Sequence, residues 1–208
     1  MIIFDMDGTL LDSSKSITKS INYVRNKLGL KPFKVEEITR LINEPDNDLP
    51  KLFYEDIKPY DECRKIFEKH YIKNCIIDMD MFDGIEYMLE SLKDEYILSV
   101  LTNAYGEFAR KMLKHLRIDK YFVEILGSDD ISSRKPNPKG IYHILTKYGI
   151  DISNTLFIGD SLKDEECAKN AGVKYIFADW GFGECKKPDM ILSSQDKKDI
   201  KNILKRIA

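Results

Sequence analysis

The pattern of apolar and polar residues changes from extended to helical near the N-terminus. Residues 2–4 form a short apolar run, as expected of a buried strand. Over residues 17–28 the apolar positions recur at three- and four-residue spacing, which predicts an amphipathic helix. Ser13 or Ser14 can cap its start and Gly29 can close its end.

More helical patterns follow before the pattern changes again. They cover residues 35–42, 49–54 and 60–71, with Pro32, Pro45 and Pro59 as breaks. Residues 14–82 are therefore predicted to form a small α-helical cap domain. The segment Phe82-Asp83-Gly84 is the expected return hinge, and its partner is expected near residues 12–14.

The remainder of the chain alternates between helices and strands. The predicted helices cover residues 85–92, 108–116, 141–148 and 164–170, and the predicted strands cover residues 96–101, 122–126, 156–158 and 175–178. Such alternation predicts an α/β fold, a Rossmann-like doubly wound parallel sheet with helices on both faces. The expected core domain comprises residues 1–13 and 83–208, interrupted by the cap at 14–82.

Two carboxylates follow the first apolar run. Asp5 and Asp7 are separated by one residue, so an extended chain turns both toward the same side. Two like charges on one face require a cation, or a proton held by one of them. Gly8 permits a sharp turn and lets main-chain N–H groups approach a ligand. This arrangement suits phosphoryl transfer; a solvated acidic turn is the alternative.

Later strand ends carry groups that could hold a phosphate. Thr102 and Asn103 place a hydroxyl and an amide after the strand at 96–101, although both are also common helix caps. Arg134 and Lys135 lie in a loop stiffened by two prolines. A rigidly held lysine is a good phosphate clamp, whereas most loop lysines are merely solvated.

The strand at 156–158 repeats the arrangement of the N-terminus. An apolar run leads into Gly159 and Asp160, and Asp164 follows four residues later, on the same face if a helix has begun. The alternative role of Asp164 is to cap that helix and stabilise its dipole. Capping or solvation could explain each of these polar residues alone. It does not explain why they follow successive strands in this order.

The amino-acid composition argues against some classes of binding partner. The chain has 208 residues, with 33 Lys and Arg against 35 Asp and Glu, so no overall basic field attracts nucleic acid or an anionic membrane. The cysteines are far apart, which favours reduced thiols and leaves disulfides open; they are Cys63, Cys75, Cys167 and Cys185. The N-terminus does not resemble a signal peptide, and no stretch approaches membrane-spanning length. We expect a cytoplasmic protein that is a monomer or a weak homodimer.

Four motifs in this order resemble the haloacid dehalogenase superfamily. They are D-x-D-G-T at residues 5–9, T-N at 102–103, K-P at 135–136 and G-D-S-x-x-D at 159–164. The helical insertion behind the first motif is similar to that family's first cap type. The chain most resembles the phosphoglycolate-phosphatase-like and β-phosphoglucomutase-like branch. Dehalogenases lack the D-x-D pair, so phosphoryl transfer is the expected chemistry.

The resemblance implies roles for the acidic residues. Asp5 would be the nucleophile that forms an aspartyl-phosphate, and Asp7 would act as general acid and base. Mg²⁺ would be held by the Asp5 carboxylate, the Asp7 main-chain carbonyl and Asp160, an oxygen set that this ion prefers. Asp164 would contact a water on the metal or orient Lys135.

The resemblance also implies the substrate contacts. Thr102, the main-chain N–H of Asn103 and Lys135 would neutralise the phosphoryl oxygens. The other predicted contacts to phosphate or substrate are Gly8, Thr9, Arg40 and Trp180. Trp180 could line the leaving-group pocket or simply pack.

The cap loop is the least informative region for substrate choice. Residues 40–48 resemble the loop that closes on substrate, with three carboxylates at Glu44, Asp46 and Asp48. These would disfavour a second anionic group unless Arg40 or Lys51 offsets them; alternatively they are solvated turn residues.

The expected function is a Mg²⁺-dependent phosphatase acting on a small phosphorylated metabolite, either phosphoglycolate-like or a sugar phosphate. One alternative is a phosphomutase of the β-phosphoglucomutase type, which must shield its aspartyl-phosphate from water. A non-catalytic binding module on the same fold is the remote alternative, because every acidic motif residue is present.

Overall fold

The computed structural model describes residues 1–43, 48–55, 57 and 59–205. The chain divides into two compact units: one comprises Met1–Leu11 and Met81–Ala208, and the other comprises Asp12–Asp80. The chain crosses between them at β2 (Leu11–Asp12) and β3 (Asp80–Met81), which pair as a two-stranded sheet.

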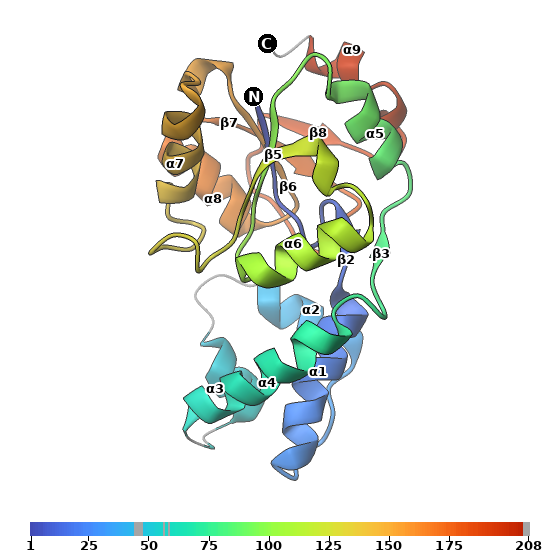
Figure 1. The fold of residues 1–208 in the computed structure, drawn as a ribbon, viewed down its shortest axis with the longest axis vertical. Coiled ribbons are helices and arrows are strands. Elements are labelled where there is room, and N and C mark those ends of the chain that lie inside the picture. Colours follow the sequence, from blue (N-terminus) through green and yellow to red (C-terminus); the bar gives the residue numbers. More distant parts are fainter. Residues whose placement is uncertain (44–47, 56, 58, 206–208) are drawn as a thin grey trace. The chain divides into compact units, whose positions relative to one another are not determined.

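The first unit contains a parallel six-stranded sheet with the order β5-β4-β1-β6-β7-β8 (Figure 1). Its strands are β1 (Ile2–Phe4), β4 (Leu98–Leu101), β5 (Phe122–Leu126), β6 (Leu156–Gly159), β7 (Lys174–Ala178) and β8 (Met190–Leu192). The predicted α/β class with a doubly wound parallel sheet and a helical insertion is confirmed. The edge strand β8 was not predicted, because three residues are too short a run to show a period on which to base a strand.

Helices cover both faces of this sheet. They are α5 (Ile85–Leu92), α6 (Gly106–His115), α7 (Lys139–Tyr148), α8 (Leu162–Ala171) and α9 (Ile200–Leu204), together with the short 3₁₀ segments η1 (Asp119–Tyr121), η2 (Ile152–Asn154) and η3 (Asp196–Lys198). Figure 1 shows α7 and α8 on one side of the sheet and α5, α6 and α9 on the other. Ile3 and Phe157 pack from the strands against Ile144 of α7 and Ala168 of α8 in one buried cluster.

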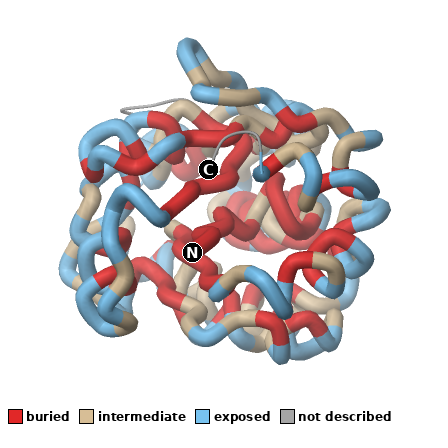
Figure 2. Tube along the Cα trace, turned by 90° about the horizontal axis from the view of Figure 1, so that it is seen from above, coloured by how far each residue is buried: buried red, intermediate tan, exposed pale blue. Residues whose placement is uncertain are grey.

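Strand β1 lies at the point where the strand order reverses. Its three residues are fully buried, and the trace at the N-terminus runs through buried residues in Figure 2. Phe4 pairs with Val100 of β4 and with Ile158 of β6. The chain therefore leaves all three strands at the same level, where ligands bind in open α/β sheets.

The second unit is helical. It contains α1 (Ser14–Lys27), α2 (Val35–Asn43), α3 (Leu49–Tyr54) and α4 (Tyr60–Asn74) around a core that includes Ile21, Val24, Ile38 and Phe53. Arg25 is buried in this core, where its guanidinium donates to the carbonyls of Lys31 and Phe53. Arg25 also pairs with the exposed Glu55 at 3.7 Å, so one buried guanidinium connects α1 to the chain after it and to the end of α3.

The start of α1 differs in detail from expectation. Ser13 occupies the N-cap position without a side-chain capping hydrogen bond. The carboxylate of Asp12 accepts the N–H of Ser14 at 2.9 Å instead. Gly29 follows the helix with a φ of 73°, a conformation that glycine adopts at no steric cost.

Candidate active site

The loop after β1 is a tight turn that only glycine allows. The carbonyl of Met6 accepts the N–H groups of Leu10 at 2.9 Å and Leu11 at 3.1 Å. Gly8 has a φ of 90°, and a Cβ there would lie 2.2 Å from a carboxylate oxygen of Asp160. The D-x-D-G-T motif therefore needs its glycine both for the turn and for this close approach.

Three buried carboxylates meet beyond the strand ends. Asp5 follows β1, Asp160 follows β6, and Asp164 lies in the first turn of α8. One oxygen from each lies within 4.8 Å of the others, and all three residues are at most 6% exposed. The structure thus brings together three of the four predicted metal ligands.

Lys135 provides a cation to this cluster. Its Nζ donates to Oδ1 of Asp5 and, at 2.7 Å, to Oδ1 of Asp164. Although burial lowers the pKa of Lys135, Asp164 and Asp5 raise it by a larger amount, so the ammonium stays charged. Lys135 is one of the predicted phosphate clamps, and it is buried rather than solvated.

Asn103 holds the main chain of Lys135 in place. Its side-chain Nδ2 donates to the Lys135 carbonyl at 3.0 Å, and its Oδ1 accepts the Lys135 N–H at 2.8 Å. The sequence had suggested that the Asn103 amide binds phosphate or caps a helix, and the resemblance had added its main-chain N–H; this contact with Lys135 was not predicted. Paired hydrogen bonds of this kind fix the loop from which the lysine side chain extends.

Thr102 lies beside Asn103 at the end of β4 and is buried. Its Oγ1 accepts the N–H of Ala104 at 3.1 Å, so its own O–H group remains able to donate. Helix α6 begins at Gly106 with Tyr105 at the N-cap position. Thr102 therefore caps the turn before the helix and not the helix itself.

Asp160 is held by Phe182 and Gly183, which were not predicted to belong to the site, although Trp180 of the same loop was. Its Oδ2 accepts the main-chain N–H groups of Phe182 at 2.9 Å and Gly183 at 3.2 Å, while its Oδ1 accepts the hydroxyl of Thr9 at 3.3 Å. A Cβ on Gly181 would lie 2.3 Å from that of Asp160. The G-x-G spacing at 181–183 was the available signal, because glycines permit such close approach.

Asp164 caps its helix and contacts Lys135, two of the roles considered for it; its contact with a metal-bound water stays a prediction. Its Oδ2 accepts the N–H of Ser161 at 3.1 Å and the Ser161 hydroxyl at 2.6 Å, which completes a capping box at the start of α8. Its Oδ1 accepts from Lys135. The helix start and the lysine position are therefore fixed by one side chain.

The charges of the cluster do not balance. Burial raises the pKa of Asp160 to about 7, with a further contribution from Asp164, and burial likewise raises the pKa of Asp5 well above its ordinary value. Lys135 pairs with two of the three carboxylates, those of Asp5 and Asp164. A divalent metal ion would offset the remaining negative charge, and carboxylate oxygens are the donors that hard cations prefer.

Asp7 and Trp180 lie in the same unit as the acidic cluster, whereas Arg40 does not. Asp7 is half-buried and forms a bridge with Leu11. Trp180 donates its indole N–H to the Thr9 carbonyl at 2.9 Å. Arg40 belongs to α2 in the helical unit, so its contact with substrate stays a prediction.

The acidic cap loop is described only at its end. Residues 44–47, which include Glu44 and Asp46, lie outside the described residues. Asp48 is the N-cap residue of α3, and its side chain accepts the N–H of Lys51 at 3.4 Å. This contact favours the turn role for Asp48.

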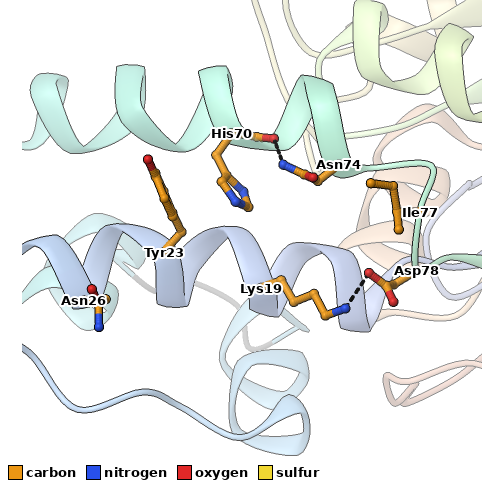
Figure 3. Close-up of a pocket in the computed structure, with 7 residues that line it drawn as sticks. All are labelled: Lys19, Tyr23, Asn26, His70, Asn74, Ile77 and Asp78. Carbon is orange, nitrogen blue, oxygen red and sulfur yellow. Dashed lines mark hydrogen bonds and ion pairs between the residues drawn. The ribbon is translucent and has the colours of Figure 1, made fainter.

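A groove between α1 and α4 of the helical unit carries none of the motif residues. Tyr23 and His70 stack there with ring centroids 4.2 Å apart, and Lys19 pairs with Asp78 at 2.6 Å (Figure 3). Ser20 lies 2.9 Å from Nδ1 of His70. The ammonium of Lys19 and one ring nitrogen of His70 are thus engaged by neighbouring side chains.

Residues 2–178 match the family model of haloacid dehalogenase-like hydrolases. The chain belongs to this family. Over 196 residues this haloacid dehalogenase-like hydrolase is 33% identical to the phosphoglycolate phosphatase of Aquifex aeolicus, covering 93% of the chain and 92% of the relative. It is 30% identical to a 5'-nucleotidase of Pseudomonas aeruginosa, over 88% of the chain and 83% of that protein.

Comparison with solved structures indicates the same family. A predicted phosphoglycolate phosphatase from Haemophilus somnus is 27% identical and superposes with a TM-score of 0.87, over 98% of this chain and 97% of the other. The hydrolase is therefore a phosphatase of this family, with the sheet and helical insertion of its relatives. In the described part of the chain, no helix has the length and apolar character needed to cross a membrane.

Proposed function

We propose that the protein is a Mg²⁺-dependent phosphatase that hydrolyses a small phosphomonoester through an aspartyl-phosphate on Asp5. The observation that carries the proposal is the convergence of Asp5, Asp160 and Asp164 on Lys135 beyond the central strands. A buried acidic cluster with one ammonium can bind a divalent cation and a phosphate together, since each offsets charge that the other leaves.

The first chemical step forms the covalent intermediate. An oxygen of the Asp5 carboxylate attacks phosphorus, the bond to the leaving oxygen breaks, and Asp7 supplies the proton that this oxygen takes up. Lys135, the hydroxyl of Thr102 and the main-chain N–H of Asn103 neutralise the phosphoryl oxygens as negative charge develops on them. Asp7 must be protonated when this step begins.

The second step returns Asp5 to its starting state. A water molecule attacks phosphorus, Asp7 takes the proton that this water releases, and the bond between phosphorus and the Asp5 oxygen breaks. Asp5, the main-chain carbonyl of Asp7 and Asp160 would hold Mg²⁺, with Asp164 binding it directly or through a water, and the ion would supply charge neutralisation. Inorganic phosphate then leaves.

The proposed substrate class is a short phosphorylated carboxylic acid such as phosphoglycolate. Its support is the 33% identity with a relative of that activity over 93% of the chain. The 5'-nucleotidase relative keeps nucleoside monophosphates on the panel of candidate substrates. No observation favours the phosphomutase alternative over hydrolysis.

Phosphate release from a panel of phosphomonoesters tests the proposal. The panel comprises phosphoglycolate, sugar phosphates and nucleoside monophosphates, each with Mg²⁺ and with a chelator. We expect Mg²⁺-dependent release, fastest with phosphoglycolate, and loss of turnover in chelator because the carboxylates then remain uncompensated.

Two outcomes would contradict the proposal. Release that persists in chelator would remove the metal requirement. Isomerisation of β-glucose 1-phosphate without phosphate release would replace hydrolysis by the mutase reaction.

Metal affinity should depend on pH. Burial raises the pKa of Asp160 to about 7, so a proton competes with the metal ion below that pH. We expect Mg²⁺ to bind about tenfold more weakly at pH 6 than at pH 8, with one proton released per ion near pH 6. Calorimetric titrations in buffers of different ionisation enthalpy measure both quantities.

Two substitutions test which carboxylate causes the pH dependence of Mg²⁺ affinity. Asp160→Asn should weaken binding at both pH values and remove the part of the pH dependence that Asp160 contributes, while Asp5, whose pKa is also raised by burial, continues to titrate. Asp94→Asn, at an exposed turn after α5, is the control and should bind as the wild type does. An unchanged pH dependence in Asp160→Asn would show that other groups account for all of it.

A further inference from the structure

Lys197 is a buried lysine outside the four motifs. It lies in η3 and is 3% exposed. Its ammonium donates to the main-chain carbonyl of Asp83 at 2.9 Å, and the negative charges of Asp83 and Asp179 act on it as well. Lysines are rarely buried, so this position calls for a physical reason.

The second contact of Lys197 is the face of Trp180. Its Nζ lies 4.0 Å from the centroid of the indole ring, within the range of a cation–π interaction. The edge of the same indole donates to the Thr9 carbonyl at 2.9 Å. Trp180 therefore connects the lysine to the loop that carries Asp7 and Gly8.

That loop is anchored on both sides of Thr9. The Thr9 hydroxyl donates to Asp160 at 3.3 Å, and the Leu10 carbonyl accepts the N–H of Phe82 at 3.3 Å. The ring of Phe82 in turn lies 5.8 Å from that of Phe182, next to the N–H groups that hold Asp160.

Four segments distant in sequence therefore meet around one ammonium. They are the motif loop at 6–11, the return segment at 82–84, the loop at 180–183 and η3. All four belong to the same unit of the chain. A bulky apolar side chain in place of the lysine could fill the space but could not reproduce both the donor and the charge.

We infer that Lys197 is a positioning residue for the acid–base carboxylate Asp7, acting through Trp180 on the Thr9 carbonyl and through Asp83 on the return segment. The inference rests on the proposed function, in which Asp7 protonates the leaving oxygen. It assigns Trp180 to the support of the catalytic loop, where its indole N–H is already committed.

Displacement of Asp7 should slow some substrates more than others. Displacing a general acid slows the release of a poor leaving group, which needs the proton, far more than that of a good one. An alkyl phosphomonoester has a poor leaving group, whereas p-nitrophenyl phosphate releases a stabilised phenolate. A general loss of folded or active enzyme would slow both substrates equally.

The decisive variant is Lys197→Met. With the alkyl phosphomonoester that the wild type hydrolyses fastest, we expect kcat to fall about tenfold while KM changes less than about twofold. With p-nitrophenyl phosphate, kcat/KM, which reports the step that forms the aspartyl-phosphate, should change less than about twofold, because this step needs no proton from Asp7. Lys197→Arg should recover most of the alkyl activity, because it keeps a cation and a donor. Lys198→Met, exposed beside it in η3, is the matched control and should behave as the wild type.

Trp180 provides a second, independent test. Trp180→Phe keeps an aromatic face for the ammonium and removes the N–H that binds Thr9, so it should cause the same substrate-selective loss. Trp180 is the only tryptophan in the sequence, and its fluorescence emission should shift in Lys197→Met and return in Lys197→Arg. If Lys197→Met fails to fold, Trp180→Phe alone decides.

The outcomes separate the inference from the proposed function. A wild type that hydrolyses neither substrate would overturn the function before any variant is made. An active wild type whose Lys197→Met and Trp180→Phe variants lose kcat/KM equally on both substrates, or on neither, would overturn the inference and leave the function standing.

Discussion

Asp5→Asn is expected to lower kcat by about 10⁴-fold or more on every phosphomonoester that the wild type hydrolyses. The amide is nearly the same size as the carboxylate but is a far weaker nucleophile, so the covalent step is lost. Steady-state phosphate release measures turnover, and mass spectrometry after rapid acid quenching measures the aspartyl-phosphate. The wild type should show this adduct and the variant should not.

The same variant should remain folded. Burial raises the pKa of Asp5, so its ionised form is unfavourable in the metal-free protein above the ordinary aspartate pKa. An uncharged asparagine removes that penalty, while Lys135 keeps Asp164 as a partner. The free energy of unfolding in chelator at pH 8 should therefore not fall.

A control and a contrary result complete this test. Asp151→Asn, at an exposed position before η2, should leave turnover and the adduct unchanged. Turnover retained by Asp5→Asn in a preparation shown by mass to lack reversion would exclude Asp5 as the nucleophile.

The meeting of the acidic residues could be predicted because it follows from strand order. Asp5 and Asp160 each follow a short apolar run, and parallel strands end at a common edge. Asp164 follows by one helical turn. Sequence pattern was sufficient here, since the register of neighbouring strands brings their ends to one level.

The position of Lys135 could not be derived in the same way. Its loop follows β5, which is the edge strand and is separated from β1 by β4. The lysine reaches Asp5 because Asn103 holds its main chain, and a side-chain amide that binds a distant loop leaves no periodic signal. The motif resemblance, and not the residue pattern, supplied that expectation.

Element boundaries were wrong where a single hydrogen bond decides them. The strand predicted at 96–101 begins at Leu98, because the N–H of Tyr96 donates to Leu92 and continues the turn after α5. The burial of Lys197 was not predicted either. A lysine beside another lysine in a polar stretch is typical of a solvated segment. Its burial depends on tertiary contacts with Trp180 and Asp83.

Lys135→Met is expected to have the largest effect on stability. In chelator at pH 8, we expect the free energy of unfolding to fall by about 3–5 kcal/mol, because buried carboxylates lose their cation. Urea denaturation followed by circular dichroism measures the change. Lys139→Met, an exposed position at the start of α7, is the control and should change stability by less than about 0.5 kcal/mol.

The sign of the pH dependence follows from the carboxylates. Burial raises the pKa of Asp5, and it raises the pKa of Asp160 to about 7. For an acid whose folded pKa is raised, ionisation destabilises the folded state; the penalty is absent below the unfolded pKa of about 4 and grows as pH rises through the folded value. Lys135 reduces this penalty in the wild type. The deficit of Lys135→Met should therefore be small at pH 5 and large at pH 8, and a deficit that does not depend on pH would exclude this electrostatic origin.

Mg²⁺ separates the two contributions of this lysine. A divalent cation bound to the remaining carboxylates should restore most of the stability lost at pH 8, because it replaces the missing positive charge. It should not restore turnover, which we expect to stay about 10²-fold or more below the wild type, since the lysine also neutralises phosphoryl oxygens in the transition state. Recovery of both properties on adding Mg²⁺ would mean that Lys135 serves only to compensate buried charge. Recovery of stability alone would mean that the same ammonium holds the acidic cluster together in the free protein and stabilises the transferring phosphoryl group during turnover.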